Sequence, residues 1–183
     1  MALPATMRKV QIALADSDRN VYEQLDLRVA QHPSESDRYL VARVLARALE
    51  HGVTGLSSLE FSKGGVSDDS EPALVQRDLT GVLVAWIEIG SPTPDRLHKA
   101  TKAARRVAVY TWKNAEQLAE AIRERGVHRA ESIELFALDP DWLDRIAATL
   151  DRVNTWDIAI TGGVIYLTIN GTLFEGSVRR VEI

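Results

Sequence analysis

The sequence predicts an α/β fold in which helices flank a mixed central β-sheet and antiparallel β-hairpins form at both ends of the chain. Strand-like and helix-like segments alternate from residue 82 to about residue 150, as they do in strand–helix–strand units. Segment 82–89, VLVAWIEI, is apolar on both faces except at Glu88, which is typical of a central strand covered on each side. Turn-forming residues separate shorter strands before and after this region.

The composition is that of an ordinary globular protein. The chain has 183 residues, 45% of them hydrophobic and 26% charged, so we expect a single domain spanning residues 1–183. The absence of Cys excludes disulfides, thiolate metal sites and cysteine nucleophiles, and it favours a reducing compartment. The N-terminus lacks a signal-peptide layout, and no apolar run approaches the roughly 20 residues of a membrane helix. We therefore expect a cytoplasmic protein that does not associate with a membrane.

The first part of the chain predicts a hairpin, a helix and a short strand. Segments 7–14 and 20–30 have β character and are joined by a run of turn formers, so they form the N-terminal hairpin. Ser34 is the expected N-cap of a helix that ends near Gly52, because the apolar residues between them recur at helical spacing. A short strand is expected at 56–61.

The rest of the chain continues the alternation and closes with short strands. After the central strand, the expected elements are a helix at 96–105, a strand at 107–112, a helix at 115–125, a strand at 133–138 and a helix from 139 to about 150. The closing strands are expected at 153–160, 164–169 and 172–183. The pairs Gly162–Gly163 and Asn170–Gly171 between them are strong hairpin turns.

Glu88 is the residue of the central strand that needs an explanation. It shares its parity with Val84 and Trp86, so it leaves the strand on a buried face, close to the carboxyl end. An unpaired buried carboxylate costs several kcal/mol, so Glu88 must be ion-paired, hydrogen-bonded, protonated or metal-bound. The alternative is that Glu88 lies beyond the covered part of the strand and meets water or a nearby Arg.

The helix at 96–105 carries the cations that follow Glu88 in the sequence. Four basic residues lie opposite its small, apolar side: His98, Lys102, Arg105 and Arg106. Lys99 lies on a flank near the helix start, and its long side chain can reach a site at the end of the strand. A solvated basic face with no function would present the same residues.

Four segments of the sequence resemble the YaeQ family. They are RVAQHPSES at 28–36, SDDSEP at 67–72, WIEIGSP with RLHKA at 86–100, and GGVIYL at 162–167. The resemblance covers nearly the whole chain, and the motifs HPSE and WIExG in this order are its most specific part. It implies a variant of the PD-(D/E)xK restriction-endonuclease-like fold, in which acidic residues hold Mg²⁺ and a Lys positions or activates the attacking water. The metal supplies charge stabilisation and a hydroxide-like nucleophile for phosphodiester cleavage.

The resemblance assigns three acids to the catalytic and Mg²⁺ site. Glu88 matches the acid of the acidic-x-Lys triplet, Glu35 matches the acid of the first helix, and Asp78 matches the acid at a strand end. One extended strand from Asp78 to Glu88 would separate the two by roughly 30 Å. They share a metal only if the chain turns sharply before the strand, and otherwise Asp69 takes this role.

The catalytic Lys of the family pattern is missing from its usual place. Gly90 stands at the third position of the triplet, and Lys99 on the following helix is the natural substitute. The resemblance thus implies a catalytic set of Glu35, Asp78, Glu88 and Lys99 for a Mg²⁺-dependent nuclease or phosphodiesterase.

Two other functions compete with a nuclease. In the first, the chain is a catalytically inactive nuclease-like protein that binds nucleic acid or a protein partner, and Glu88 and Lys99 form a buried ion pair. The missing Lys at position 90 and the net charge of −4 favour it, because a fold alone does not fix a function. In the second, the basic helix face, through Lys102 and Arg106, handles nucleic acid.

Overall fold

The computed structural model describes residues 4–55, 58–63 and 70–183. The described chain divides into two compact units. Unit 1 comprises Met1–Val44 and Asp139–Val178, and unit 2 comprises Leu45–Leu138 and Arg179–Ile183. The expectation of one domain over residues 1–183 stays a prediction.

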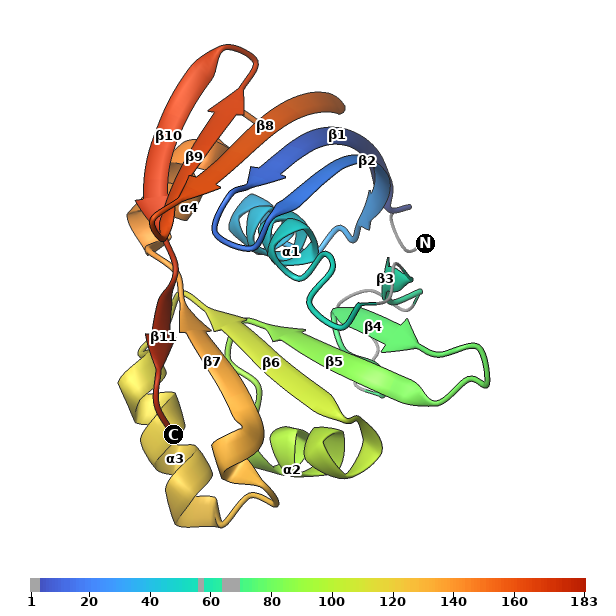
Figure 1. The fold of residues 1–183 in the computed structure, drawn as a ribbon, viewed down its shortest axis with the longest axis vertical. Coiled ribbons are helices and arrows are strands. Elements are labelled where there is room, and N and C mark those ends of the chain that lie inside the picture. Colours follow the sequence, from blue (N-terminus) through green and yellow to red (C-terminus); the bar gives the residue numbers. More distant parts are fainter. Residues whose placement is uncertain (1–3, 56–57, 64–69) are drawn as a thin grey trace. The chain divides into compact units, whose positions relative to one another are not determined.

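Unit 1 is built on a five-stranded mixed sheet with the strand order β10-β9-β8-β1-β2 (Figure 1). Its strands are β1 (Thr6–Asp16), β2 (Val21–Gln31), β8 (Val153–Thr161), β9 (Val164–Ile169) and β10 (Thr172–Ser177). β1 and β8 run parallel, whereas the other neighbouring pairs are antiparallel. The hairpins predicted at the two ends of the chain therefore belong to one sheet, which β1 and β8 join.

One face of this sheet is buried. In β8, buried and exposed residues alternate without exception along the strand, as period-2 side-chain geometry requires. Helix α4 (Pro140–Ala147) packs on the buried face, where Trp142 lies against Gly176 of β10. The first part of helix α1 (Asp37–Leu49) is tied to the same layer, since Arg43 donates to the Ala30 carbonyl of β2.

Unit 2 is built on a six-stranded mixed sheet with the order β11-β7-β6-β5-β4-β3. Its strands are β3 (Leu59–Phe61), β4 (Leu74–Arg77), β5 (Leu83–Ile89), β6 (Arg106–Thr111), β7 (Ile133–Ala137) and β11 (Arg179–Val181). Its helices are α2 (Pro94–Ala103), α3 (Ala115–Arg125) and the 3-10 helix η2 (Ala130–Ser132). β5, β6 and β7 are parallel neighbours, so the predicted strand–helix–strand alternation is confirmed.

One strand prediction needs correction, and one strand was not predicted. The strand predicted at 172–183 ends at Ser177, and β11 then pairs with β7 in the other sheet. The physical reason is that Ser177 pairs with Val164, the first residue of β9, so β10 has no partner strand beyond it. β4 was not predicted, because its four residues are too few to display a clear period.

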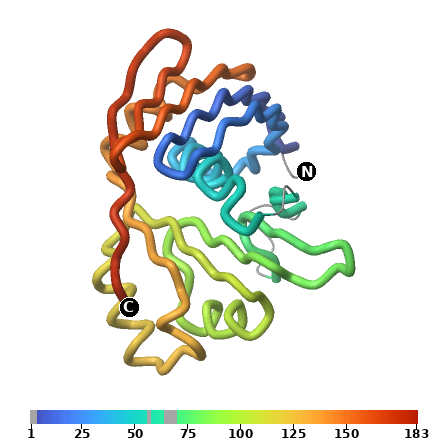
Figure 2. Tube along the Cα trace, in the orientation of Figure 1, coloured from blue at the N-terminus to red at the C-terminus, as the bar shows by residue number. Residues whose placement is uncertain are grey.

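The chain trace passes from β10 through Val178 into β11 near the C-terminus (Figure 2). None of the helices in the described parts of the chain is both long and apolar enough to cross a membrane.

Candidate functional site

Glu88 lies on a buried face of β5, as its parity predicts. Six of the seven residues of β5 are buried, and the Glu88 side chain is only 6% exposed. Trp86, two residues earlier on the same face, donates from its indole Nε1 to Oε1 of Glu88 at 2.6 Å. Arg96 donates from Nε to the same oxygen, also at 2.6 Å. The carboxylate thus receives both the cation and the donor that its burial requires.

Arg96 is held in place by the start of helix α2. Thr93 caps this helix by accepting a hydrogen bond from the Arg96 backbone amide at 3.2 Å, and Pro94 occupies the first turn, where no backbone donor is needed. The Arg96 side chain also donates from Nη2 to the Glu71 carbonyl at 2.6 Å. Its guanidinium carbon lies 5.9 Å from the Trp86 ring, within cation–π range.

The turn that leads from β5 to α2 depends on a glycine. Gly90 has a φ of +92°, a conformation that residues with a Cβ rarely adopt. Its amide donates to the Tyr110 carbonyl at 2.8 Å, which keeps the end of β5 beside β6. The turn at Gly90 sets the direction of α2, and this direction brings the Arg96 side chain into contact with Glu88.

Lys99 is not the partner of Glu88. Its side chain is exposed, and the structure gives it no ion pair or hydrogen bond with any described residue. The ion pair expected between Glu88 and Lys99 is formed by Arg96 instead. The reason is that Arg96 lies one turn closer to the start of α2, next to the strand end.

Asp78 forms the turn between β4 and β5. Its Oδ1 accepts hydrogen bonds from the Thr80 amide at 2.9 Å, the Thr80 hydroxyl at 2.6 Å and the Val82 amide at 3.0 Å. The hydrogen bond from the Thr80 hydroxyl is the main cause that lowers the pKa of Asp78 below its usual value. The chain does turn sharply here, but Asp78 lies before the first residue of β5, whereas Glu88 is near its last. About 16 Å of strand separates these ends, so the two carboxylates are not brought together.

Glu35 lies in unit 1, in the turn before α1 and not on the helix. The N-cap was predicted at Ser34, but α1 begins at Asp37 and the Ser36 hydroxyl accepts from the Tyr39 amide at 3.2 Å. Glu35 is buried and lies 2.9 Å from the Arg43 guanidinium. Burial raises the pKa of Glu35, and the charge of Arg43 opposes this shift.

The acids expected to share a metal therefore each have another partner. Glu35 pairs with Arg43 in unit 1, and Glu88 pairs with Arg96 in unit 2. Asp69, the alternative to Asp78, lies outside the described residues. Within residues 4–55, 58–63 and 70–183, no group of three or more His, Asp or Glu side chains is placed to hold a metal ion.

A second buried charge network in unit 2 was missed by the sequence analysis. Arg106 forms ion pairs with Glu50 and, at 2.7 Å, with Glu134. Glu50 also accepts from the Tyr110 hydroxyl at 2.7 Å, and burial raises the pKa of this phenol well above its usual value. Arg106 belongs to β6 and not to the solvated side of a helix, so its assignment to the basic helix face was wrong. The pairing could not be predicted because Glu50 is far from the other members in sequence.

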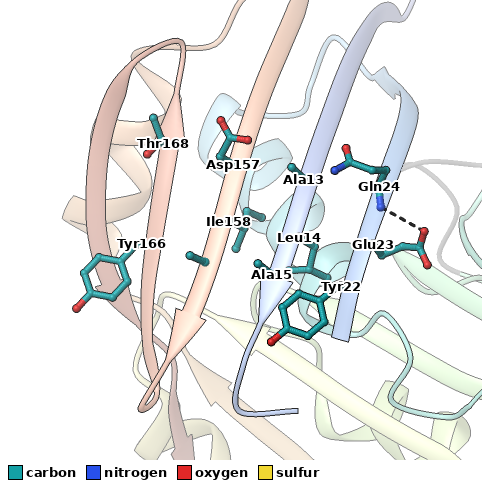
Figure 3. Close-up of a pocket in the computed structure, with 11 residues that line it drawn as sticks. Ala13, Leu14, Ala15, Tyr22, Glu23, Gln24, Asp157, Ile158, Tyr166 and Thr168 are labelled. Atoms are coloured by element: carbon teal, nitrogen blue, oxygen red, sulfur yellow. Dashed lines mark hydrogen bonds between the residues drawn. The ribbon is translucent and has the colours of Figure 1, made fainter. Parts of the chain in front are cut away.

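The unburied face of the five-stranded sheet, here called the outer face, carries two hollows. The first has a volume of about 570 Å³ and is lined by residues of β1, β2, β8 and β9. Tyr22 and Tyr166 rise from it on opposite sides of Ala15 (Figure 3), and they are 62% and 37% exposed. Asp157 and Gln24 line the same hollow.

The second hollow of the outer face is basic. It has a volume of about 560 Å³ and is lined by Met7, Arg8, Lys9, Arg28, Arg152 and Val153. The side chains of Arg28 and Arg152 make no ion pair with any described residue. Lys9 has only a 4.0 Å approach to Asp26. In a chain of net charge −4, this hollow is a local concentration of positive charge.

Comparisons with known proteins give a consistent result for the whole chain. The family model described as YaeQ protein matches residues 1–177. The YaeQ protein of Escherichia coli K12 is 32% identical over 169 residues, which are 92% of this chain and 91% of that protein. The Salmonella typhi YaeQ protein is 30% identical over the same shares of the two chains. Both relatives carry the name "Uncharacterized protein YaeQ".

Solved structures agree with the sequence relatives. The crystal structure of YaeQ protein from Pseudomonas syringae matches with a TM-score of 0.88 and 28% identity, covering 100% of this chain and 98% of that one. The structure of the YaeQ protein from Xanthomonas axonopodis pv. citri matches with a TM-score of 0.86 and 29% identity, covering 97% and 98%. The resemblance noted in the sequence motifs is therefore confirmed, and the chain belongs to the YaeQ family.

Proposed function

We propose that this chain is a nucleic-acid-binding protein on a nuclease-like fold and that it does not cleave its ligand. The observation that carries the proposal is the pairing of Glu88 with Arg96 in unit 2. In a metal-dependent nuclease the corresponding carboxylate faces Mg²⁺, an ion that takes oxygen ligands in near-ideal octahedral geometry. Here a guanidinium and an indole N–H both donate to Oε1 of Glu88, so the carboxylate already has a cation beside it.

The residues that the resemblance assigns to Mg²⁺ do not fit the ion. Oδ1 of Asp78 already accepts three hydrogen bonds at the far end of β5. Glu35 is paired with Arg43 within unit 1. A guanidinium stays protonated at any physiological pH, so neither arginine releases its partner by losing its charge. We therefore derive no catalytic step through a metal.

Nucleic acid is favoured over a protein partner by the charge of the outer face. Arg28 and Arg152 are exposed and their side chains have no ion-pair partner among the described residues. Arginines of this kind neutralise phosphates and release their counterions, and this counterion release supplies most of the free energy of non-specific binding to nucleic acid. The basic helix face is a weaker candidate, because Arg106 is already paired with two carboxylates.

The test measures binding and cleavage in the same samples. Labelled single- and double-stranded DNA and RNA are mixed with the purified chain in EDTA, Mg²⁺ or Mn²⁺. Fluorescence anisotropy reports binding, and a denaturing gel reports cleavage. We expect salt-sensitive binding in all three conditions and no cleavage in any.

Two results would overturn the proposal. Metal-dependent cleavage that disappears in Glu88→Gln would establish the nuclease predicted from the family resemblance. Glu88→Gln is a suitable variant because it keeps the shape of the side chain and removes the charge that a metal requires. Failure to bind any of the four nucleic acids at low salt would leave a protein partner as the remaining choice.

A further inference from the structure

We infer that the outer face of the five-stranded sheet binds single-stranded nucleic acid, with bases stacked on Tyr22 and Tyr166 and phosphates held by Arg28, Arg152 and Lys9. The class of ligand rests on the proposed function. The location and the binding mode rest on the residues of the two hollows in unit 1.

The two tyrosines stand in one row across the sheet. Tyr22 of β2 pairs with Ala15 of β1, Ala15 pairs with Ala159 of β8, and Ala159 pairs with Tyr166 of β9. Both rings therefore project from the same face (Figure 3). Three strand spacings of about 4.8 Å place them roughly 14 Å apart. That is too wide to sandwich one base, but it lets each ring stack with a separate base.

The floor between the rings is low enough to admit a ligand. Ala15 and Ala159 have methyl side chains, so the bases can lie against the sheet without meeting a large residue. Exposed aromatic rings over a small-residue floor form a stacking platform, and stacking tolerates any sequence because every base has a π-face.

The next row of the outer face supplies polar groups at the edge of the platform. Gln24 pairs with Ala13, Ala13 pairs with Asp157, and Asp157 pairs with Thr168. A carboxylate accepts from the exocyclic amine of cytosine, and an amide both donates to and accepts from adenine. Asp157 also repels phosphate, so the backbone must run elsewhere on this face.

The basic hollow supplies the place for that backbone. Arg28 pairs with Lys9 across β1 and β2, and Lys9 pairs with Val153, next to Arg152. Lys9 is six residues from Ala15 on the same strand, or about 20 Å at the rise of a β-strand. A stacked strand rises about 3.4 Å per nucleotide along its axis, so this distance corresponds to at most roughly six nucleotides, and to fewer in an extended strand.

One row of the outer face lies between the polar groups and the basic hollow. It consists of Asp26, Gln11 and Thr155, which pair across β2, β1 and β8. Asp26 repels phosphate as Asp157 does, whereas Gln11 and Thr155 are neutral. The ligand backbone is therefore expected to cross this row over β1 and β8.

A duplex does not fit this arrangement as well as a single strand does. Its bases are stacked on one another, so its phosphates could meet the basic hollow while the tyrosines would remain unused. The structure therefore assigns the two hollows together to an unpaired segment.

The experiment measures the affinity of the full chain for labelled single-stranded oligonucleotides of about ten nucleotides. Tyr22→Ala and Tyr166→Ala are each expected to weaken binding roughly 5- to 150-fold, because one stacked base is lost. Tyr22→Phe and Tyr166→Phe keep the ring and should bind like the parent chain. Arg28→Gln with Arg152→Gln should reduce the slope of log K against log salt by about 1.4, since two phosphate contacts are lost.

Matched controls come from unit 2. Lys102→Gln with Arg105→Gln removes the same formal charge from exposed positions on and just after α2 and should leave the salt slope unchanged. Thermal melting of every variant checks that the chain stays folded, which is expected because both tyrosines are exposed.

The outcomes separate this inference from the proposed function. Binding that is unchanged in both alanine variants, or that falls equally in the phenylalanine variants, overturns the stacking site while nucleic-acid binding itself stands. A slope that changes only in the Lys102 and Arg105 control moves the site to α2 and also overturns it. Duplex binding as tight as single-strand binding, with no effect of the tyrosines, contradicts the choice of ligand.

Discussion

Replacing Arg96 by Met tests the central feature of unit 2. The Glu88 side chain is 6% exposed and that of Arg96 is 22% exposed, so removing the guanidinium leaves a carboxylate in a nearly dry site. Breaking a buried pair from one side costs about 3–5 kcal/mol. Glu88 keeps its hydrogen bond from Trp86 and part of the Arg96 side chain is exposed. We therefore expect the low end of that range, about 3 kcal/mol.

Lys99→Met is the matched comparison on the same helix. Lys99 is exposed, and substitutions at such positions usually change stability by less than about 0.5 kcal/mol. Urea unfolding followed by tryptophan fluorescence gives both values. Comparing the two variants shows which side chain stabilises Glu88: Arg96, which lies beside it in the structure, or Lys99, which was predicted there from the sequence.

A double-mutant cycle then isolates the interaction itself. In Glu88→Gln with Arg96→Met the buried charge is gone, so the double variant should be more stable than Arg96→Met alone. A coupling energy above about 1 kcal/mol is expected for groups in direct contact. The reasoning is refuted if Arg96→Met is as harmless as Lys99→Met, or if the two substitutions are additive.

Three further predictions concern other groups in the packed parts of the two units. Gly176→Ala should destabilise the chain by about 1–3 kcal/mol through overpacking, because the new Cβ would lie 2.4 Å from the Trp142 ring. Ser177→Ala is the control, and equal unfolding midpoints for the two variants would contradict the clash. Tyr110→Phe should cost about 1.5–3 kcal/mol, because the hydroxyl donates to buried Glu50; an unchanged urea midpoint would count against this bond. Burial raises the pKa of Glu35 above 4.5, so the folded state binds this proton more tightly than the unfolded state does, and this contribution to stability is lost as pH rises through the folded pKa. As the pH rises from 4.5, Glu35→Gln should therefore lose less stability than the parent chain does, and parallel curves of unfolding free energy against pH would refute the shift.

The local elements of the fold could be predicted from the sequence because their signals are short-range. The apolar residues on both faces of β5 identified it as a central strand. The face to which the Glu88 side chain points followed from the alternation of side chains along the strand alone. The turns at Gly162 and Asn170 fixed the closing hairpins. Parity also predicted that a cation or donor would meet Glu88, and Arg96 and Trp86 fulfil that requirement.

The long-range pairings could not be predicted in the same way. Ile12 of β1 pairs with Trp156 of β8, although most of the chain lies between them, and no periodicity records which strands become neighbours. Arg96 was overlooked in favour of Lys99 because the choice depends on the Gly90 turn, which sets the direction of α2. The tyrosine row could not be predicted from the sequence either. It forms only because β2 and β9 belong to the same sheet.

The buried pair also allows a test of whether it serves stability or binding. Buried ion pairs are poor sources of stability, and replacing both partners by well-packed apolar residues is often neutral or stabilising by about 1–4 kcal/mol. Glu88→Met with Arg96→Met should therefore fold at least as well as the parent chain, unlike Arg96→Met alone. Because the proposed ligand lies on the outer face of unit 1, the folded double variant should also keep its affinity for single-stranded nucleic acid. A double variant that folds but no longer binds would place Glu88 and Arg96 in the binding machinery, and the assignment of the ligand to the outer face would then fail.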